Sequence, residues 1–571
     1  MRQPLIRFII HCTLLLVSVS ALAQNDQTPF SYTIRKTAFV NHGAVVSAHP
    51  LASHAGMEIL RQGGNAFDAA ITTQLVLAVV YPAAGNIGGG GFMVAHTADG
   101  KNITLDYREK APTAATRDMY LDADGNPRTD LSQNGHLASG VPGTIAGIFD
   151  ELRYAKLGFP RLIQPAIDLA ENGFALTASE ARGLNSAQKA FRKYNTVLPV
   201  FVNERGWKAG DTLIQKDLAR TLRRIRDLGA KGFYEGETAR LIVAEMQRGK
   251  GIITMSDLKG YTAKERQPAI FPYKQYTVVT MPLPSSGGVI LQQMMKMVED
   301  QPLASYGFGS VKAVHLMTEV ERLAYADRAK YLGDRDFYSV PVDTLTSHAY
   351  LQRRMAEIQP ARAGSSKDIG AGMLSPKSEE TTHFEVVDDQ GNAVSITTTL
   401  NGGYGSKVVV GGAGFFLNNE MDDFSVKPGV PNMYGAVGTE ANAIAPGKRM
   451  LSSMTPTIVL EKGKVYLVVG TPGGTTITTS VFQTLLDILD FGLSAEDAVN
   501  KPKFHHQWLP DSLYVEKTFP SDTREKLTNM GYNISQRGSI GRTEVIKIIP
   551  GPAHRIEAVG DSRGEDTAEG Y

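Results

Sequence analysis

The sequence predicts a mixed α/β fold of the α+β kind, in which helices cover the faces of sheets. Segments with helical periodicity dominate residues 145–330, and β-hairpin patterns dominate from residue 381 onward. Both halves contain helices and strands together, without the regular alternation that a βαβ wheel requires. A chain of 571 residues is long enough to bury a large core around such sheets.

The first 23 residues have the features of a secretory signal. Arg2 and Arg7 precede an apolar run over residues 8–19, and a small-x-small sequence ends at Ala23. A retained membrane anchor is the alternative, but the apolar run is shorter than the ~20 residues of a spanning helix. We therefore expect a signal peptide over 1–23, cleavage after Ala23, and a periplasmic or secreted protein.

Composition excludes several classes of function. The sole cysteine, Cys12, lies in the signal, so the mature protein is expected to have neither a disulfide nor a thiol nucleophile. The formal net charge is +1 with 20% charged residues, so bulk charge favours neither nucleic acid nor an anionic membrane surface. We expect no nucleic-acid partner and no membrane contact after signal removal.

The N-terminal half begins with two predicted helices, over 50–61 and 67–80, the first with proline at its start and glycines after its end. A glycine-rich loop, "GNIGGGGFM" at 85–93, leads into an apolar strand, an Asp99-Gly100 turn and a returning strand. The loop precedes a strand and lacks a following GK[ST], so it does not fit a phosphate-binding loop. Residues 145–330 read mostly as helices, with a long one over 314–330.

Three hairpins are predicted after residue 381, each with a short glycine-containing turn. One helical pattern, over 477–489, interrupts them. The paired segments are 384–388 with 393–398, 457–460 with 465–469, and 545–549 with 555–559.

A segment rich in Gly, Ser and charge, over 361–380, precedes the first hairpin and reads as a mobile loop or a linker between domains. It ends at Glu380, and Thr381 opens the predicted strand. A threonine hydroxyl is a poor nucleophile unless a base lies close by. At a chain start the residue's own α-amine, with a pKa near ~7.7 to 8, can be that base. Self-cleavage before Thr381 would create such a start, although β-propensity alone also explains a Thr-Thr pair.

Further motifs identify a resemblance. They are "LDYREKAP" at 105–112, "TTH" at 381–383, "GNAVSITTTLN" at 391–401, "NNEMDDFS" at 418–425, "LSSMTPTIV" at 451–459 and "GTPGG" at 470–474. In this order the chain resembles the γ-glutamyltranspeptidases, a family of N-terminal-nucleophile hydrolases, from about residue 40 to its end. The resemblance implies a four-layer αββα sandwich with a helical large-subunit body.

The resemblance also implies processing of one precursor into two subunits. Cleavage between Glu380 and Thr381 would give a large subunit, 24–380, and a small catalytic subunit, 381–571. Thr381 would be the processing residue and then the nucleophile, and Thr399 would orient it. The residues alone do not distinguish Thr399 from Thr397 or Thr398, because a threonine that simply fills a strand position explains all three equally well.

The resemblance assigns the remaining site residues to the γ-glutamyl group. Arg108 would hold its α-carboxylate, a task suited to a bidentate guanidinium, although an Arg in "DYREK" is more often a surface ion pair. The hydroxyls of Ser452 and Ser453 would support that carboxylate. Asn401, Glu420 and Asp423 would accept hydrogen bonds from the α-ammonium. The backbone amides of Gly473 and Gly474 would form the oxyanion hole. Tyr434, in the loop 428–439, would be the aromatic residue of a lid over the pocket.

The expected activity is that of a γ-glutamyltransferase and glutathione hydrolase that passes the γ-glutamyl group to water, an amino acid or a dipeptide. No cofactor and no metal are expected, since the neighbouring His505 and His506 would point to opposite faces of a strand. Two alternatives remain open. One is a related acylase that cleaves glutaryl or similar side chains, and the other is a non-catalytic binding protein with the same fold.

Overall fold

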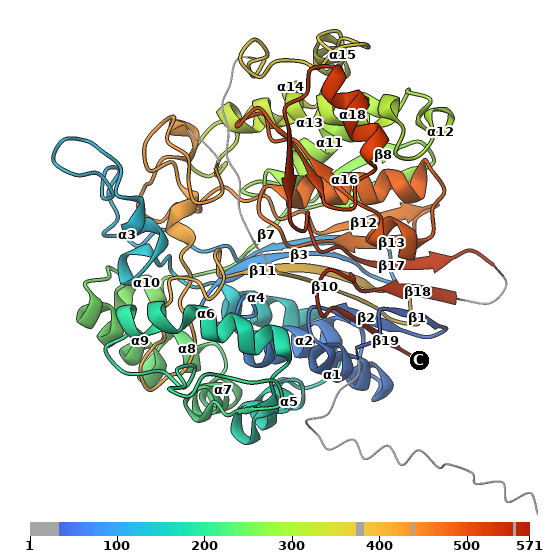
Figure 1. Ribbon diagram of the computed structural model, residues 1–571. Coiled ribbons are helices and arrows are strands. Elements are labelled where there is room, and N and C mark those ends of the chain that lie inside the picture. Colours follow the sequence, from blue (N-terminus) through green and yellow to red (C-terminus); the bar gives the residue numbers. More distant parts are fainter. Residues whose placement is uncertain (1–33, 373–381, 436–438, 552–554) are drawn as a thin grey trace, which may run out of the picture.

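Two large sheets lie face to face in this protein, and helices cover the outer face of each (Figure 1). The structure is a computed structural model that describes residues 34–372, 382–435, 439–551 and 555–571. The layers follow the order helix, sheet, sheet, helix. The predicted αββα sandwich is therefore confirmed.

Sheet B, which contains the strand that follows Thr381, is antiparallel throughout, with its strands in the order β19-β2-β10-β11-β3-β4-β7. Its central strands are buried on both faces, because the second sheet covers one face and helices cover the other. The strands are β19 (Thr567–Gly570), β2 (Ala44–Ser47), β10 (Thr382–Val387), β11 (Ala393–Thr399), β3 (Gly90–His96), β4 (Asn102–Asp106) and β7 (Lys264–Arg266).

Sheet A is also antiparallel, in the order β1-β18-β17-β13-β12-β9-β8. It includes the second and third predicted hairpins. The strands are β1 (Thr37–Val40), β18 (Arg555–Val559), β17 (Glu544–Ile549), β13 (Lys464–Gly470), β12 (Thr457–Glu461), β9 (Tyr276–Thr280) and β8 (Ala269–Tyr273).

Side chains from both sheets form an apolar layer between them. Phe92 and Val94 of sheet B and Ile458 and Val468 of sheet A are among its fully buried members. Alternating residues of each strand face this layer, as the period of two in the hairpin sequences requires.

The helices of the N-terminal half cover sheet B, and α1 and α2 pack directly on its strands. Both begin as the sequence dictates: His49 and Pro50 start α1, and an Asn65–Asp68 capping box starts α2. This layer also contains α5, α7 and α9. The bounds are α1 (Pro50–Arg61), α2 (Ala66–Val80), α4 (Thr144–Glu151), α5 (Phe159–Asn172), α6 (Ala178–Tyr194), α7 (Lys216–Leu228) and α9 (Gly236–Gly249).

A second helical layer covers sheet A and draws on both halves of the chain. Its members are α11 (Gly287–Val298), α13 (Val311–Tyr331), α15 (His348–Met355), α16 (Thr476–Leu489), α17 (Ala495–Asn500) and α18 (Ser521–Asn529). A small sheet of β14 (Phe504–His505), β15 (Leu513–Glu516) and β16 (Ile534–Arg537) flanks it.

Two parts of the sequence prediction need correction. Residues 264–280 form β7, β8 and β9 within a region predicted to be mostly helical. The C-terminal part contains α17 and α18 as well as the one predicted helix. In the segment predicted as mobile, residues 361–372 hydrogen-bond to the body of the protein, for example Ser366 N to Asp511, and residues 373–380 lie outside the described residues. Among the described residues, no helix is long and apolar enough to cross a membrane.

Candidate active site

The start of β10 is the point where the proposed nucleophile joins the sandwich. Thr381 and Glu380 lie outside the described residues, and β10 begins at the next residue, Thr382. Thr382 pairs with Thr398 of β11. Because the strands are antiparallel, the end of β11, where Thr399 stands, lies beside the start of β10. The role of Thr399 as the orienting hydroxyl stays a prediction.

Thr399 and Asn401 are joined by a hydrogen bond in the turn that ends β11. The backbone N–H of Asn401 donates to Thr399 Oγ1 at 2.7 Å, and its side-chain amide donates to the carbonyl of Asn419 at 3.0 Å. Asn401 has a φ of 69°, a left-handed conformation that asparagine tolerates better than most residues. The turn therefore holds Thr399 and Asn401 in fixed positions beside the motif 418–425.

Asn86 is a site residue that the sequence analysis missed. Its side-chain amide donates to Thr398 Oγ1 (3.1 Å) and to the carbonyl of Thr399 (2.8 Å), and its oxygen accepts from Gly89 N (3.0 Å) and Thr144 Oγ1 (2.7 Å). At Gly89 an added Cβ would lie 2.0 Å from the Thr399 carbonyl oxygen. The glycine-rich loop therefore lets the backbone approach the end of β11, and Asn86 fixes that approach.

Replacing Asn86 with alanine should lower both stability and turnover. The substitution removes five hydrogen bonds, one of them to the carbonyl of Ala84, at a residue that is 4% exposed, so we expect a loss of roughly 3 kcal/mol in the free energy of unfolding. Turnover should fall because Thr399 loses its support. Asn529→Ala, at an exposed position in α18, is the control in thermal unfolding and activity assays. Unchanged kcat in Asn86→Ala would show that Thr399 is held by other contacts.

The charged residues among the predicted carboxylate and ammonium ligands form one buried cluster. Arg108, Glu420 and Asp423 are each 0% exposed, so Arg108 is not a surface residue. Its Nη1 pairs with Glu420 Oε1, and its Nη2 lies 2.5 Å from Asp423 Oδ2. The Glu109 carboxylate lies 3.6 Å from Nη1. The structure thus brings these residues together from segments more than 300 positions apart in the chain.

Ser452 and Ser453 follow directly on the backbone that contacts Arg108. The guanidinium of Arg108 donates to the carbonyls of Met450 and Leu451, both at 3.4 Å. Ser453 Oγ accepts from Arg328 Nη2 at 2.8 Å. Arg328 belongs to α13 and was not predicted as a site residue, because nothing in its helical sequence distinguishes it from a packing residue.

Gly473 and Gly474 form a turn between β13 and α16. Their φ angles are 140° and 65°, and neither amide N–H donates a hydrogen bond to another described residue. The carbonyl of Gly473 accepts from Thr476 N and Oγ1, which fixes the turn at the N-terminus of a 14-residue helix. Free amides at a helix N-terminus suit a developing oxyanion.

His383, near the start of β10, packs against the end of β13, the strand that leads into this turn. An added Cβ at Gly470, the last residue of β13, would lie 2.2 Å from His383 Cε1. Burial lowers the pKa of His383 to about 3, so its imidazole is neutral. Its ring nitrogens pair with Thr397 Oγ1 and Glu385 Oε1, both at 2.9 Å. His383 therefore acts as an uncharged packing residue between the two strands.

Residues 52–571 match the model described as gamma-glutamyltranspeptidase. The chain belongs to the γ-glutamyltranspeptidase family.

Curated relatives agree with this family. The glutathione hydrolase proenzyme of Escherichia coli K12 is 44% identical over 97% of this chain and 96% of that protein. The glutathione hydrolase proenzyme of Pseudomonas aeruginosa PAO1 is 46% identical over 95% and 96%. Acylase ACY 1 proenzyme of Pseudomonas strain SE83 is 35% identical over 88% of each protein.

Solved structures resemble the γ-glutamyltranspeptidase fold described above. Cephalosporin acylase from Bacillus halodurans superposes with a TM-score of 0.83 at 26% identity, covering 95% of this chain and 98% of that chain. γ-Glutamyltranspeptidase from Helicobacter pylori gives 0.56 at 47% identity, covering 57% of this chain and 95% of that chain.

The lid that the γ-glutamyltranspeptidase resemblance implies stays a prediction, although part of its loop lies near the charge cluster. Tyr434 is half-buried, and its N–H donates to Asn432 Oδ1. The adjacent Met433 contacts Asn419 and donates its N–H to Asp422. Residues 436–438 of the same loop lie outside the described residues.

Across the described ranges, no three His, Cys, Asp or Glu side chains are grouped as metal ligands. His505 pairs with Thr479 and Gln507, whereas His506 pairs with Asp511. These partners give each imidazole a structural role.

Proposed function

We propose that this chain is an exported, self-processing γ-glutamyltranspeptidase and glutathione hydrolase. The buried cluster of Arg108, Glu420 and Asp423 carries the proposal. An α-amino acid group is a zwitterion, so it can insert into this cluster with its carboxylate on Arg108 and its ammonium on the two acids. Ser452, Ser453 and Asn401 would complete its hydrogen bonds.

Catalysis would use the start of β10 and the Gly473-Gly474 turn. Thr381 Oγ would attack the γ-carbonyl of a γ-glutamyl donor, with its own α-amine as the base and Thr399 as the orienting group. The amides of Gly473 and Gly474 would hold the oxyanion. The amine leaves, and water, an amino acid or a dipeptide then takes the γ-glutamyl group from Thr381.

The same hydroxyl would first open the Glu380–Thr381 bond. This cleavage would give a large subunit, 24–380, and a small subunit, 381–571, after removal of a signal over 1–23. The relatives from Escherichia coli and Pseudomonas aeruginosa are both named proenzymes, which supports this order of events. A periplasmic or secreted location follows from the signal.

A related acylase is the second candidate, because the chain also resembles cephalosporin acylase and Acylase ACY 1. A glutaryl group carries the same carboxylate spacing as a glutamyl group but lacks the α-ammonium. A glutaryl carboxylate on Arg108 would compete with Glu420 and Asp423 for their buried cationic partner and would bring no ammonium to compensate these two acids.

Paired anilide substrates separate the two candidates. We expect kcat/KM for γ-glutamyl anilide to exceed that for glutaryl anilide by at least ~100-fold, because a site built for a charged group rejects the analogue that lacks it. Both substrates release the same aniline, so a single absorbance assay reports both. A preference for the glutaryl substrate would assign the chain to the acylases, and turnover of neither would favour a binding protein.

A further inference from the structure

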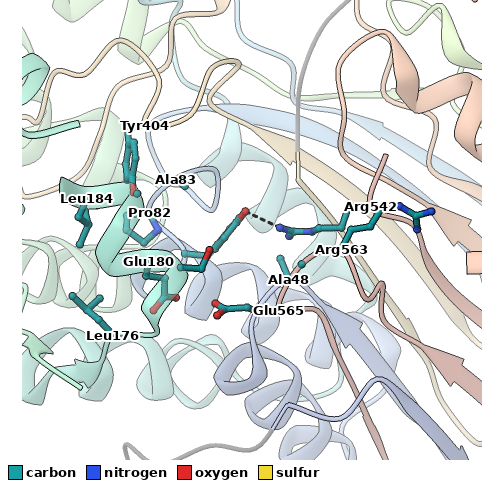
Figure 2. A pocket seen from close by; sticks show the side chains of 14 residues that line it. Ala48, Pro82, Ala83, Leu176, Glu180, Leu184, Tyr404, Arg542, Arg563 and Glu565 are labelled. Carbon is teal, nitrogen blue, oxygen red and sulfur yellow. Dashed lines mark hydrogen bonds between the residues drawn. The ribbon is translucent and has the colours of Figure 1, made fainter. Parts of the chain in front are cut away.

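A pocket of about 250 Å³ lies on the side of sheet B where β10 begins, separate from the Arg108 cluster (Figure 2). Both predicted subunits contribute to it: α6 and the loop before the glycine-rich segment on one side, and the C-terminal loops on the other. We call it the Tyr81–Arg542 pocket. Its walls include Ala48, Tyr81, Pro82, Glu180, Arg542 and Glu565.

The pocket adjoins the proposed catalytic groups. Ala48 follows Ser47, which pairs with Phe384 of β10, so Ala48 lies beside the first residues of that strand. Arg542 N donates to Thr471 Oγ1 at 2.7 Å, in the segment that leads to Gly473. A Cβ added at Gly473 would lie 3.2 Å from Gly541 Cα. A molecule in the pocket would therefore lie next to the oxyanion turn.

Arg542 has hydrogen-bonding capacity that the protein does not use. Its Nη1 donates to the Tyr81 hydroxyl at 3.0 Å, and its Nε lies 2.9 Å from Asp566 Oδ1. Among the described residues, Nη2 is a buried donor with no hydrogen-bond acceptor, and the Tyr81 hydroxyl donates to no described acceptor. Figure 2 shows the Arg542 guanidinium directed into the pocket, whereas that of Arg563 points away from it.

The other charged groups of the pocket are already occupied. Glu180 accepts from Thr177 N and lies 3.0 Å from His49 Nε2. Glu565 accepts from Thr177 Oγ1 at 2.8 Å, and burial raises its pKa. The Arg563 guanidinium binds Glu516 and Asp561. Arg542 is thus the cation with donors to spare, and a planar guanidinium beside a hydroxyl suits a carboxylate.

We propose that the Tyr81–Arg542 pocket binds the carboxylate of the departing or accepting peptide, such as the glycine carboxylate of glutathione. The inference rests on the proposed function, because it assigns the other half of the same substrate. The Arg108 cluster takes the γ-glutamyl end, and the scissile amide lies between the two, near the start of β10 and the Gly473 turn. The pocket then sets preference among donors by the charge of the leaving group.

The test compares glutathione with its glycine methyl ester, which lacks the free carboxylate. For the unmodified enzyme we expect kcat/KM to be about 10- to 100-fold higher for glutathione, since hydrogen bonds to a charged group are lost in the ester. Arg542→Lys should reduce this ratio at least ~5-fold, because an ammonium does not reproduce the planar contact. Tyr81→Phe should reduce it by a smaller factor.

Tyr81→Phe keeps Arg542 and its Asp566 contact, so it carries the test if Arg542→Lys fails to fold. Arg182→Gln, on an exposed position of α6, is the matched charge control and should keep the unmodified ratio. A purely structural Arg542–Tyr81 contact would alter both substrates equally and leave the ratio unchanged, which would overturn the inference.

The γ-glutamyl anilide separates failure of the inference from failure of the proposed function. Anilide hydrolysis together with an equal kcat/KM for glutathione and its ester would overturn the inference alone. An enzyme that hydrolyses neither the anilide nor glutathione would overturn the proposed function, and the inference with it.

Discussion

Thr381→Ala is expected to remain a single uncleaved chain and to lose at least ~10⁴-fold in turnover, because processing and catalysis would use the same hydroxyl. The unmodified protein should give a small fragment of 191 residues, which is 571 minus 380, beginning Thr-Thr-His-Phe. Denaturing electrophoresis and N-terminal sequencing of the fragment measure the first effect, and γ-glutamyl anilide hydrolysis measures the second.

Thr382→Ala is the matched control for this experiment. Its hydroxyl has no hydrogen-bond partner in the described part of the chain, so its removal should leave cleavage and turnover close to normal. Thr381→Ser keeps a hydroxyl and should still process, more slowly. Cleavage of Thr381→Ala at the same bond would mean that another group attacks it, and an intact unmodified chain would favour a binding protein.

The sequence predicted those elements whose signal is local. Proline at the start of α1 and glycine after its end gave the observed helix 50–61, and alternation with glycine turns gave all three hairpins of the C-terminal half. Strands β7 to β9 escaped prediction because Lys264–Arg266 is a short polar edge strand, and its neighbours lie between long helices.

The site was predictable only where residues stand in recognisable motifs. Arg108, Glu420 and Asp423 were each assigned by resemblance, but their mutual pairing depends on contacts over more than 300 residues of chain. Asn86 and Arg328 lack any local sign of their roles, because their partners, Thr399 and Ser453, are brought near only by the packed sheets and α13. The motifs therefore predicted which functional groups belong to the site, whereas the pairing of these groups depends on the tertiary structure.

Arg108→Lys is expected to process normally and to raise KM for γ-glutamyl donors by about 100-fold. A lysine ammonium retains the positive charge between Glu420 and Asp423, but it is a point charge and does not bind a carboxylate through two parallel hydrogen bonds. Steady-state kinetics with γ-glutamyl anilide give KM. Arg117→Lys, where the arginine is partly exposed and pairs with the exposed Glu440, is the control.

The choice of lysine matters because Arg108→Gln would leave two buried acids without a cation and cost about 3 to 5 kcal/mol in folding, which would obscure any effect on binding. Arg108→Lys keeps a cation beside these acids and so avoids that effect.

The glutaryl anilide tests which group Arg108 binds. If Arg108 binds the α-carboxylate, the lysine variant should weaken the binding of glutamyl and glutaryl anilides alike, since both carry that group. Glu420→Gln should instead weaken the glutamyl substrate selectively, since only that substrate has the ammonium. An unchanged KM in Arg108→Lys would show that another residue holds the carboxylate, and Arg328, which donates to Ser453 Oγ, would be the next arginine to substitute.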